Sequence, residues 1–280
     1  MNAGAVTFGD HSPAFGSLRE EPVESVPTMK QPVRDKSRAL LVVAADVERD
    51  ATIKAITEHT GAALGRVYLE HHTVYELGQI SRTDVTLAHV AQGTVTPDSA
   101  GPAAQELIDK IKPDFLILEG ICYGLKDDDA RSPQRLGDVL VANEIKLIAH
   151  QKISGRLVDR GGAVHPSATL LDRFRSASLD WAGPATVHIG PMVSESVLVN
   201  SAAYRAQIKK RYPEAIGGEM EAAGIYAAAI RGRVEWCVVK ACCDWGFNKT
   251  DEAQRTAADN AASFVAHMIK IGGLDPVTRR

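Results

Sequence analysis

The sequence predicts a layered α/β domain built on a largely parallel or mixed β-sheet. Continuous apolar runs of strand length, such as residues 39–45 and 115–118, are typical of strands that are buried on both faces. Segments with the apolar spacing of a helix separate these runs, and glycine or proline ends several of them. This alternation indicates a sheet with helices packed against it.

The individual elements follow from local signals. Asp46 is a candidate N-cap for the helix after the first strand, Gly61 a candidate end for that helix, and Pro113 breaks the next one. In chain order we expect a strand at 39–45, a helix at about 49–60, two or three strands within 66–79 and 83–92, a helix at 102–112, strands at 115–118 and 137–142, a helix near 167–179, a strand at 186–193, helices at 201–211 and 219–231, a strand at 235–241 and a helix at 252–271.

Residues 1–38 differ from the rest of the chain. They hold Pro13, Pro22, Pro27 and Pro32 among Ser, Glu and Lys, without apolar periodicity. Such a segment buries too little surface to offset its ordering entropy, so we expect a mobile tail. The remaining residues, 39–280, are expected to form one domain.

Composition excludes several classes of protein. The 280 residues are 45% hydrophobic, which is enough for a sizeable core without disulfides. A balance of 32 basic and 35 acidic side chains argues against a nucleic-acid or membrane-surface binder. No apolar run approaches the roughly 18–20 residues that cross a bilayer, and no signal peptide is visible, so we expect a cytoplasmic protein. The four cysteines show no metal-ligand spacing, and no metal or cofactor site is expected.

Acidic residues at strand ends and helix starts are the candidates for chemistry, because partial burial raises a carboxyl pKa toward neutrality. Plain structural roles stay open for each: a helix cap for Asp46, a complement to a helix dipole for Glu219 and Glu221, and a loop cap for Asp244. The candidates are Asp46, Glu48 and Asp50 after the first strand, Glu219 and Glu221 in the GGEMEAAG segment (217–224), and Asp244 after the strand at 235–241.

Two motifs carry a family resemblance: YPEAIGGEMEAAG (212–224) and VVKACCD (238–244). Together they resemble the paired signature of the nucleoside phosphorylase/nucleosidase superfamily, over about residues 39–272. In reaction type, methylthioadenosine/S-adenosylhomocysteine nucleosidases are the nearest well-known members, and residues 244–262 look most like phosphorylase-like domains of bacterial signalling and defence proteins. The resemblance implies a three-layer α/β/α sandwich with a central mixed sheet, and a homodimer or higher homo-oligomer.

The resemblance also assigns roles within the motifs. Asp244 matches the acid that protonates the purine as it leaves, Glu221 the carboxylate that grips the ribose, and Met220 the residue that packs on the sugar, with Glu219 beside it. Asp50 is the first match for the carboxylate that orients water, and Glu48 is the second.

Two further segments correspond to substrate-binding positions. Leu198 and Val199 fall where the family places its base-stacking pair, although neither is aromatic. The segment Gly120, Ile121 and Cys122 matches the turn that holds phosphate in phosphorylases, with Ile121 in place of a serine. An apolar side chain cannot satisfy a phosphate dianion.

The absent phosphate ligands favour hydrolysis of an adenine-type nucleoside or nucleotide. A phosphorylase and a nucleoside-sensing domain with little turnover stay open as alternatives. Arg131 and Arg135 are candidates to meet a phosphorylated 5′ end. His71 and His72 are expected to point to opposite faces of a strand and to form no chelating pair.

Overall fold

The structure, a computed structural model, describes residues 35–94, 96–148, 151–154, 156–159, 162–247 and 249–276. All but the last four residues of the tail expected at 1–38 lie outside the described residues, so that expectation stays a prediction. The first strand begins at Ser37, two residues earlier than expected. None of the helices in the described ranges combines the length and the apolar character that a membrane span needs.

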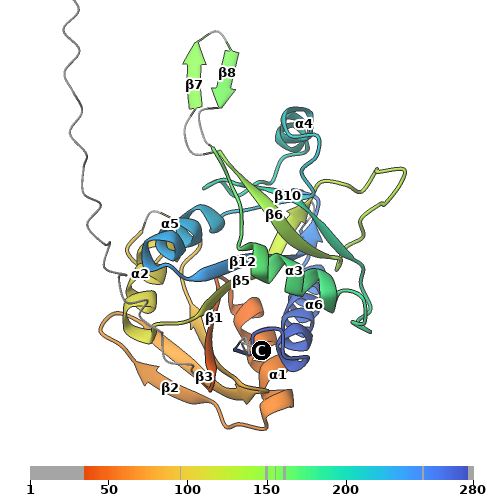
Figure 1. Cartoon of the computed structure of the whole chain (residues 1–280). Helices are drawn as coiled ribbons and strands as arrows, with labels where there is room; N and C mark the ends of the chain where they lie inside the picture. The colour runs from red at the N-terminus through yellow and green to blue at the C-terminus, as the bar shows by residue number, and fades with distance from the viewer. Residues whose placement is uncertain are drawn as a thin grey trace, which may run out of the picture. The chain divides into compact units, whose positions relative to one another are not determined.

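Helices and strands alternate along the chain much as the sequence predicts (Figure 1). In chain order they are β1 (Ser37–Val43), α1 (Asp46–Thr60), β2 (Gly65–Tyr68), β3 (Thr73–Ile80), β4 (Thr83–His89), α2 (Ala100–Ile111), β5 (Phe115–Gly124), β6 (Val139–Leu147), β7 (Gln151–Ser154), β8 (Arg156–Asp159), β9 (Ala163–Val164), α3 (Ala168–Ala177), β10 (Val187–Ser194), α4 (Ala202–Arg211), β11 (Gly217–Glu219), α5 (Ala222–Gly232), β12 (Glu235–Asp244) and α6 (Asp251–Lys270).

The central sheet is mixed, as predicted. Its strand order is β11-β10-β6-β12-β5-β1-β4-β3-β2, and β9 pairs with β6 outside this path. Parallel pairs join β1 to β4 and to β5, and β5 to β12, whereas β12 and β6 are antiparallel. Because β11 pairs with β10 and also with β5, one part of the sheet curls into a closed ring of five strands.

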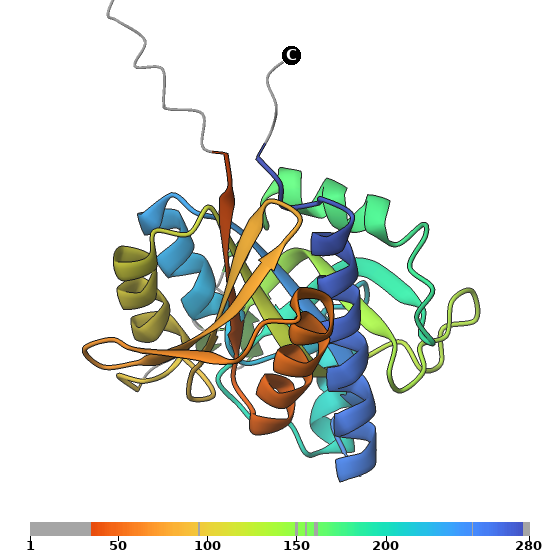
Figure 2. The same cartoon turned by 90° about the horizontal axis from the view of Figure 1, so that it is seen from below.

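Helices cover both faces of the sheet, which confirms the predicted α/β/α layering. Helices α1, α3 and α6 supply Ile56, Phe174 and Phe264 to one apolar core, and Figure 2 shows α1 alongside α6. Helices α2 and α5 cover the other face. These two helices cross closely at Gly224 and Gly101. A Cβ added to Gly224 would lie only 2.6 Å from the backbone nitrogen of Gly101.

Three local predictions are wrong. The turn expected after residue 118 is instead a continuation of β5 to Gly124, because β12 and β11 pair with this part of the strand. Glu219 ends a short strand, and α5 begins only at Ala222. The N-cap of α1 is Ala45, and Asp46 is the first helical residue.

The topology gathers several chain segments at one edge. Strands β1, β4, β5 and β12 run parallel to one another, so that their carboxyl ends meet there. Ligands in open α/β sheets bind outside these ends.

Candidate active site

A cavity of about 260 Å³ lies at this edge, and we refer to it as the catalytic pocket. Apart from Asp46, Asp50 and Gly120, the candidate catalytic and binding residues of the two motifs and the strand ends line it, although they come from five separate segments. They are Glu48, Ile121, Cys122, Leu198, Val199, Glu219, Met220, Glu221 and Asp244.

Glu48 lies at the back of this pocket with only 3% of its surface exposed. Its Oε2 accepts hydrogen bonds from the backbone N–H groups of Ala44 (2.7 Å) and Ala45 (2.9 Å), and its Oε1 accepts one from Ile121 (2.7 Å). The bond from Ala45 also caps the first turn of α1. One side chain therefore joins the end of β1, the start of α1 and the middle of β5.

Gly120 makes room for this carboxylate. Its φ angle is +144°, and a Cβ built on it would lie 2.0 Å from Glu48 Oε1. A larger residue would both strain the backbone and displace Glu48. Gly120 thus shapes the pocket through Glu48, although it does not line the pocket itself.

The buried cation of the site is Lys240, a residue that the sequence analysis did not select. Its side chain is 1% exposed, and Nζ lies 3.7 Å from Glu48 Oε1 and 3.5 Å from Glu221 Oε2. Burial alone lowers the pKa of Lys240, but Glu48 and Glu221 more than offset this effect and raise it, so the amine stays charged. The sequence signal that could have identified this buried cation is a lysine within the apolar run of β12.

Glu221 and Glu219 have different environments. Glu221 Oε1 accepts a hydrogen bond from the backbone N–H of Gly93 (3.1 Å), on the segment after β4. Glu219 Oε2 instead accepts from the backbone N–H groups of Glu221 and Ala222, both at 2.8 Å, and so caps α5. Burial, and then the charge of Glu221, raise the pKa of Glu219 to about 7.

Asp244 ends β12 at the other end of the pocket. Its Oδ1 accepts a hydrogen bond from the backbone N–H of Gly246 (2.6 Å), which fixes the orientation of the carboxyl group. The Cys243 thiol donates to Oδ2 at 3.2 Å, and Lys249 Nζ lies 3.8 Å from the same oxygen. Burial and the neighbouring Asp244 raise the pKa of Cys243, so the thiol keeps its proton.

The first choice for the water-orienting group has to be corrected. The side chain of Asp50 is 67% exposed, pairs with Arg49 at 2.8 Å and does not line the pocket. Asp50 follows Glu48 by two residues on a helix, so the two side chains point in different directions. Glu48, the second choice, is the one that lies in the pocket.

Tyr123 is another lining residue that the sequence analysis missed. It is the aromatic side chain among the described residues of the pocket wall. Its hydroxyl donates to Glu195 Oε1 (2.9 Å), and the hydroxyl of Tyr204 donates to the other oxygen of Glu195. The ring is thereby fixed beside Gly218, where an added Cβ would collide with it.

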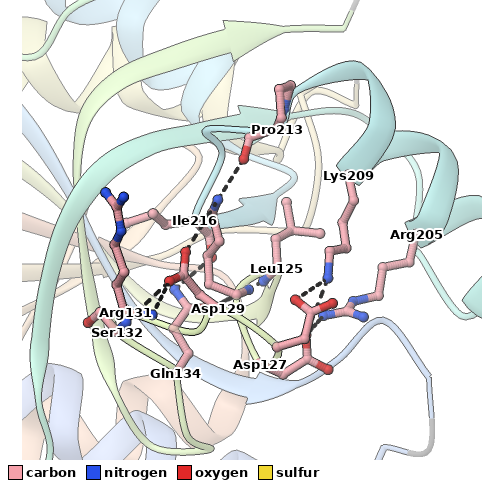
Figure 3. Close-up of polar contacts among 12 residues, drawn as sticks. Leu125, Asp127, Asp129, Arg131, Ser132, Gln134, Arg205, Lys209, Pro213 and Ile216 are labelled. Atoms are coloured by element: carbon pink, nitrogen blue, oxygen red, sulfur yellow. Dashed lines mark hydrogen bonds and ion pairs between the residues drawn. The ribbon is translucent and has the colours of Figure 1, made fainter.

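The arginines expected near a phosphorylated 5′ end do not line the catalytic pocket. Arg131 lies in the loop after β5, where its backbone N–H donates to Asp129 Oδ1 (Figure 3). Ion pairs from Arg205 and Lys209 to Asp127 tie this loop to α4. The loop therefore forms a separate polar network, not a wall of the pocket.

Comparisons with known proteins find similar sequences. A death domain-containing ATP nucleosidase of Amphimedon queenslandica is 29% identical over 197 residues, which are 60% of this chain but only 36% of that protein. A 5′-methylthioadenosine/S-adenosylhomocysteine nucleosidase of Maridesulfovibrio salexigens is 24% identical over 70% of this chain and 85% of its own length.

Solved structures share the fold. The 5′-methylthioadenosine/S-adenosylhomocysteine nucleosidase of Neisseria meningitidis, in complex with methylthio-immucillin-A, superposes with a TM-score of 0.69 at 24% identity, over 84% of this chain and 99% of its own. A futalosine hydrolase mutant of Helicobacter pylori gives the same score at 15% identity, over 84% of this chain and 99% of its own. The family model of the phosphorylase superfamily matches residues 39–270. Since this match spans most of the sequence and contains every residue of the catalytic pocket, the chain belongs to the phosphorylase superfamily.

Proposed function

We propose that this chain is a purine nucleosidase, which hydrolyses the N-glycosidic bond of an adenine-type nucleoside or nucleotide. The named relatives are nucleosidases, and the pocket holds a carboxylate for each step of such a reaction. Family membership alone would also permit phosphorolysis. The choice of water as the nucleophile therefore depends on the donors of the pocket.

The environment of Glu48 carries this choice. A phosphate dianion needs several donors or cations when it is buried. The backbone N–H groups of Ala44, Ala45 and Ile121 all donate to Glu48. The charge of Lys240 also faces Glu48 and Glu221. A fixed anion thus occupies the donor set that phosphate would require.

Glu48 can still activate water. A carboxylate offers about four lone-pair sites, and three of those on Glu48 accept backbone N–H groups. The fourth is left to accept a hydrogen bond from a water molecule in the pocket. We infer that Glu48 orients this water and takes up its proton as the water attacks C1′ of the ribose.

The other carboxylates act on the base and the sugar. Asp244, oriented by Gly246, protonates the purine ring so that the base leaves as a neutral group. Glu221 accepts hydrogen bonds from the ribose hydroxyls, and its charge stabilises the positive charge that develops on the sugar. Met220 packs on the sugar, while Leu198 and Val199 contact the base.

Isotope labelling separates hydrolysis from phosphorolysis. The protein is incubated with adenosine in H₂¹⁸O, with and without inorganic phosphate, and the sugar product is examined by mass spectrometry. Hydrolysis predicts ¹⁸O-labelled ribose and adenine release that does not depend on phosphate. Ribose 1-phosphate formed only when phosphate is present would establish the phosphorylase alternative instead.

Replacement of the proposed acid provides a second test. We expect Asp244→Asn to lower kcat for adenine release by at least about a hundredfold, the lower end for a general acid. Asp251→Asn, on the exposed first turn of α6, is the matched control. Unchanged turnover of the Asp244 variant would refute its role, whereas nucleoside binding without base release by the native protein would favour the sensing alternative.

Compartment and assembly remain part of the proposal. We expect the chain to act in the cytoplasm as a homodimer or higher homo-oligomer. Sedimentation equilibrium of the full chain measures the assembly, and a monomer at micromolar concentration would contradict that expectation.

A further inference from the structure

A second cavity, of about 620 Å³, adjoins the catalytic pocket. We refer to it as the histidine pocket, because the side chains of His71, His72 and His89 line it together with Asp46 and Asp98. Its volume is more than twice the 260 Å³ of the catalytic pocket. The reaction proposed above uses none of these side chains.

The two cavities are connected along two chain segments. Ala44 and Ala45, at the end of β1, line both. After β4, Ala91 lines the histidine pocket and Gln92 lines the catalytic pocket. The next residue, Gly93, donates to Glu221, the carboxylate proposed to hold the ribose. The histidine pocket thus adjoins the part of the catalytic pocket near Glu221, where the ribose is proposed to bind.

His71 and His72 face the same carboxylate, contrary to the expectation that they point to opposite faces. Both are in the turn between β2 and β3, and both face Glu106 Oε2, at 3.0 Å from His71 Nδ1 and 3.8 Å from His72 Nε2. His89 ends β4, and its Nδ1 lies 3.9 Å from Asp46 Oδ1. Side-chain exposure falls from 67% for His71 to 27% for His89 and 10% for His72.

The lining combines hydrogen-bond donors with carboxylates. Imidazole N–H groups and the hydroxyls of Thr73 and Tyr75 can donate hydrogen bonds to phosphate oxygens. Asp46 also pairs with Arg49 at 2.6 Å. The carboxylates of Asp46 and Asp98 are suited to Mg²⁺, which prefers oxygen ligands and keeps its phosphate and water ligands when it binds. Within the described ranges, no three side chains come close enough to hold a metal by themselves, so the ion would arrive with the phosphates.

We propose that the histidine pocket binds the 5′-phosphate chain of an adenine nucleoside polyphosphate together with its magnesium ion. The proposal rests on the nucleosidase function proposed above and adds its substrate class. A small apolar 5′ group would leave this large polar cavity unused. A 5′ amino-acid arm could pair its ammonium group with Asp46 or Asp98, but its single carboxylate would use few of the imidazole and hydroxyl donors.

Equilibrium binding tests the proposal without turnover. The Asp244→Asn protein is titrated by calorimetry with adenosine, S-adenosylhomocysteine, and ATP with and without Mg²⁺. We expect MgATP to bind more tightly than the other ligands, and removal of Mg²⁺ to weaken its binding. Equal affinity for adenosine and MgATP would overturn the proposal, as would tighter binding of S-adenosylhomocysteine.

Variants test which side chains of the histidine pocket contribute to the binding of MgATP. In the same background, His89→Gln and His72→Gln should each weaken MgATP binding relative to adenosine binding by at least about tenfold, the value of one hydrogen bond to a charged group. His59→Gln, on the exposed end of α1, is the matched control. A ratio that stays the same in both variants would refute the assignment to this pocket.

Turnover by the native protein distinguishes a failure of this proposal from a failure of the nucleosidase function on which it rests. Adenine release from adenosine without any preference for MgATP would overturn the histidine pocket alone. No base release from any of these compounds would overturn the nucleosidase function itself.

Discussion

Removal of the Lys240 charge is the strongest test of how the catalytic pocket is held together. The amine is buried at 1% exposure between Glu48 and Glu221. Lys240→Met keeps the length and most of the volume of the side chain but leaves two buried carboxylates without their cation. We expect the variant to lose activity and to be much less stable.

The size of the effect follows from burial. Breaking a buried ion pair by removing one partner costs about 3–5 kcal/mol in the free energy of unfolding. The loss should depend on pH, because Lys240 lowers the pKa of Glu219, which burial raises to about 7, and removing the lysine raises that pKa further. Folding then weakens as pH rises, and the penalty is smaller at pH 5 than at pH 8.

Urea unfolding of native and variant protein at these two pH values measures both quantities. Lys210→Met, on the exposed face of α4, is the matched control and should change stability by less than about 0.5 kcal/mol. Adding Glu48→Gln to Lys240→Met should restore part of the lost stability, since one orphaned charge is removed. A loss below about 1 kcal/mol for Lys240→Met, as for an exposed pair, would refute the reasoning.

Three other predictions concern neighbours of this lysine. Glu48→Gln should lower kcat by at least about a hundredfold, whereas Asp50→Asn should leave it unchanged; equal losses in steady-state assays would contradict our choice of Glu48. Gly120→Ala should displace the Glu48 carboxylate and destabilise the fold by about 1–3 kcal/mol through backbone strain alone, as measured by thermal unfolding; native activity would show that the pocket adapts. Burial, with the charge of Glu48, raises the pKa of Glu119 from 4.5 to about 8. The protonated Glu119 therefore contributes fully to the free energy of unfolding below pH 4.5, and this contribution is lost as the pH rises to 8. The loss amounts to at most about 5 kcal/mol, at about 1.4 kcal/mol per pKa unit. Glu119→Gln should flatten this decline in urea unfolding, and an unaltered pH profile would show that other groups cause it.

The layers of the fold could be predicted because their signals are local. Apolar runs such as residues 39–45 identify buried strands, and Gly61 ends a helix with the left-handed φ of +62° that glycine favours. The curl of the sheet could not be predicted, because it depends on β11 pairing with β5 across about 90 residues of chain. The same distant pairing converted the turn expected at 119–124 into a strand.

Some residues of the catalytic pocket could likewise be predicted from the sequence, and others could not. Asp244 and Glu221 could be predicted from the sequence because each lies within a motif beside a strand or helix end. Choosing between Glu48 and Asp50 requires the direction in which α1 leaves β1, which the spacing of two residues does not reveal. Lys240 was missed because an isolated lysine in an apolar strand acquires meaning only when the partners from α1 and α5 lie next to it.

In the proposed mechanism, Glu48 makes the pocket selective for water without any bulky barrier to phosphate. The donors that it uses come from the end of β1 and from β5, and both segments are fixed by their parallel pairing in the sheet. A phosphate ion could enter only if Glu48 swung out, which would leave three backbone N–H groups and part of the charge of Lys240 to the incoming ion. Because Glu48 also caps α1, that movement would remove the cap and destabilise the first turn of the helix. In the proposed mechanism the preference for hydrolysis is thus tied to the stability of α1: Glu48→Ala should both lower stability in urea unfolding and gain phosphate-dependent turnover, and either change without the other would contradict the link.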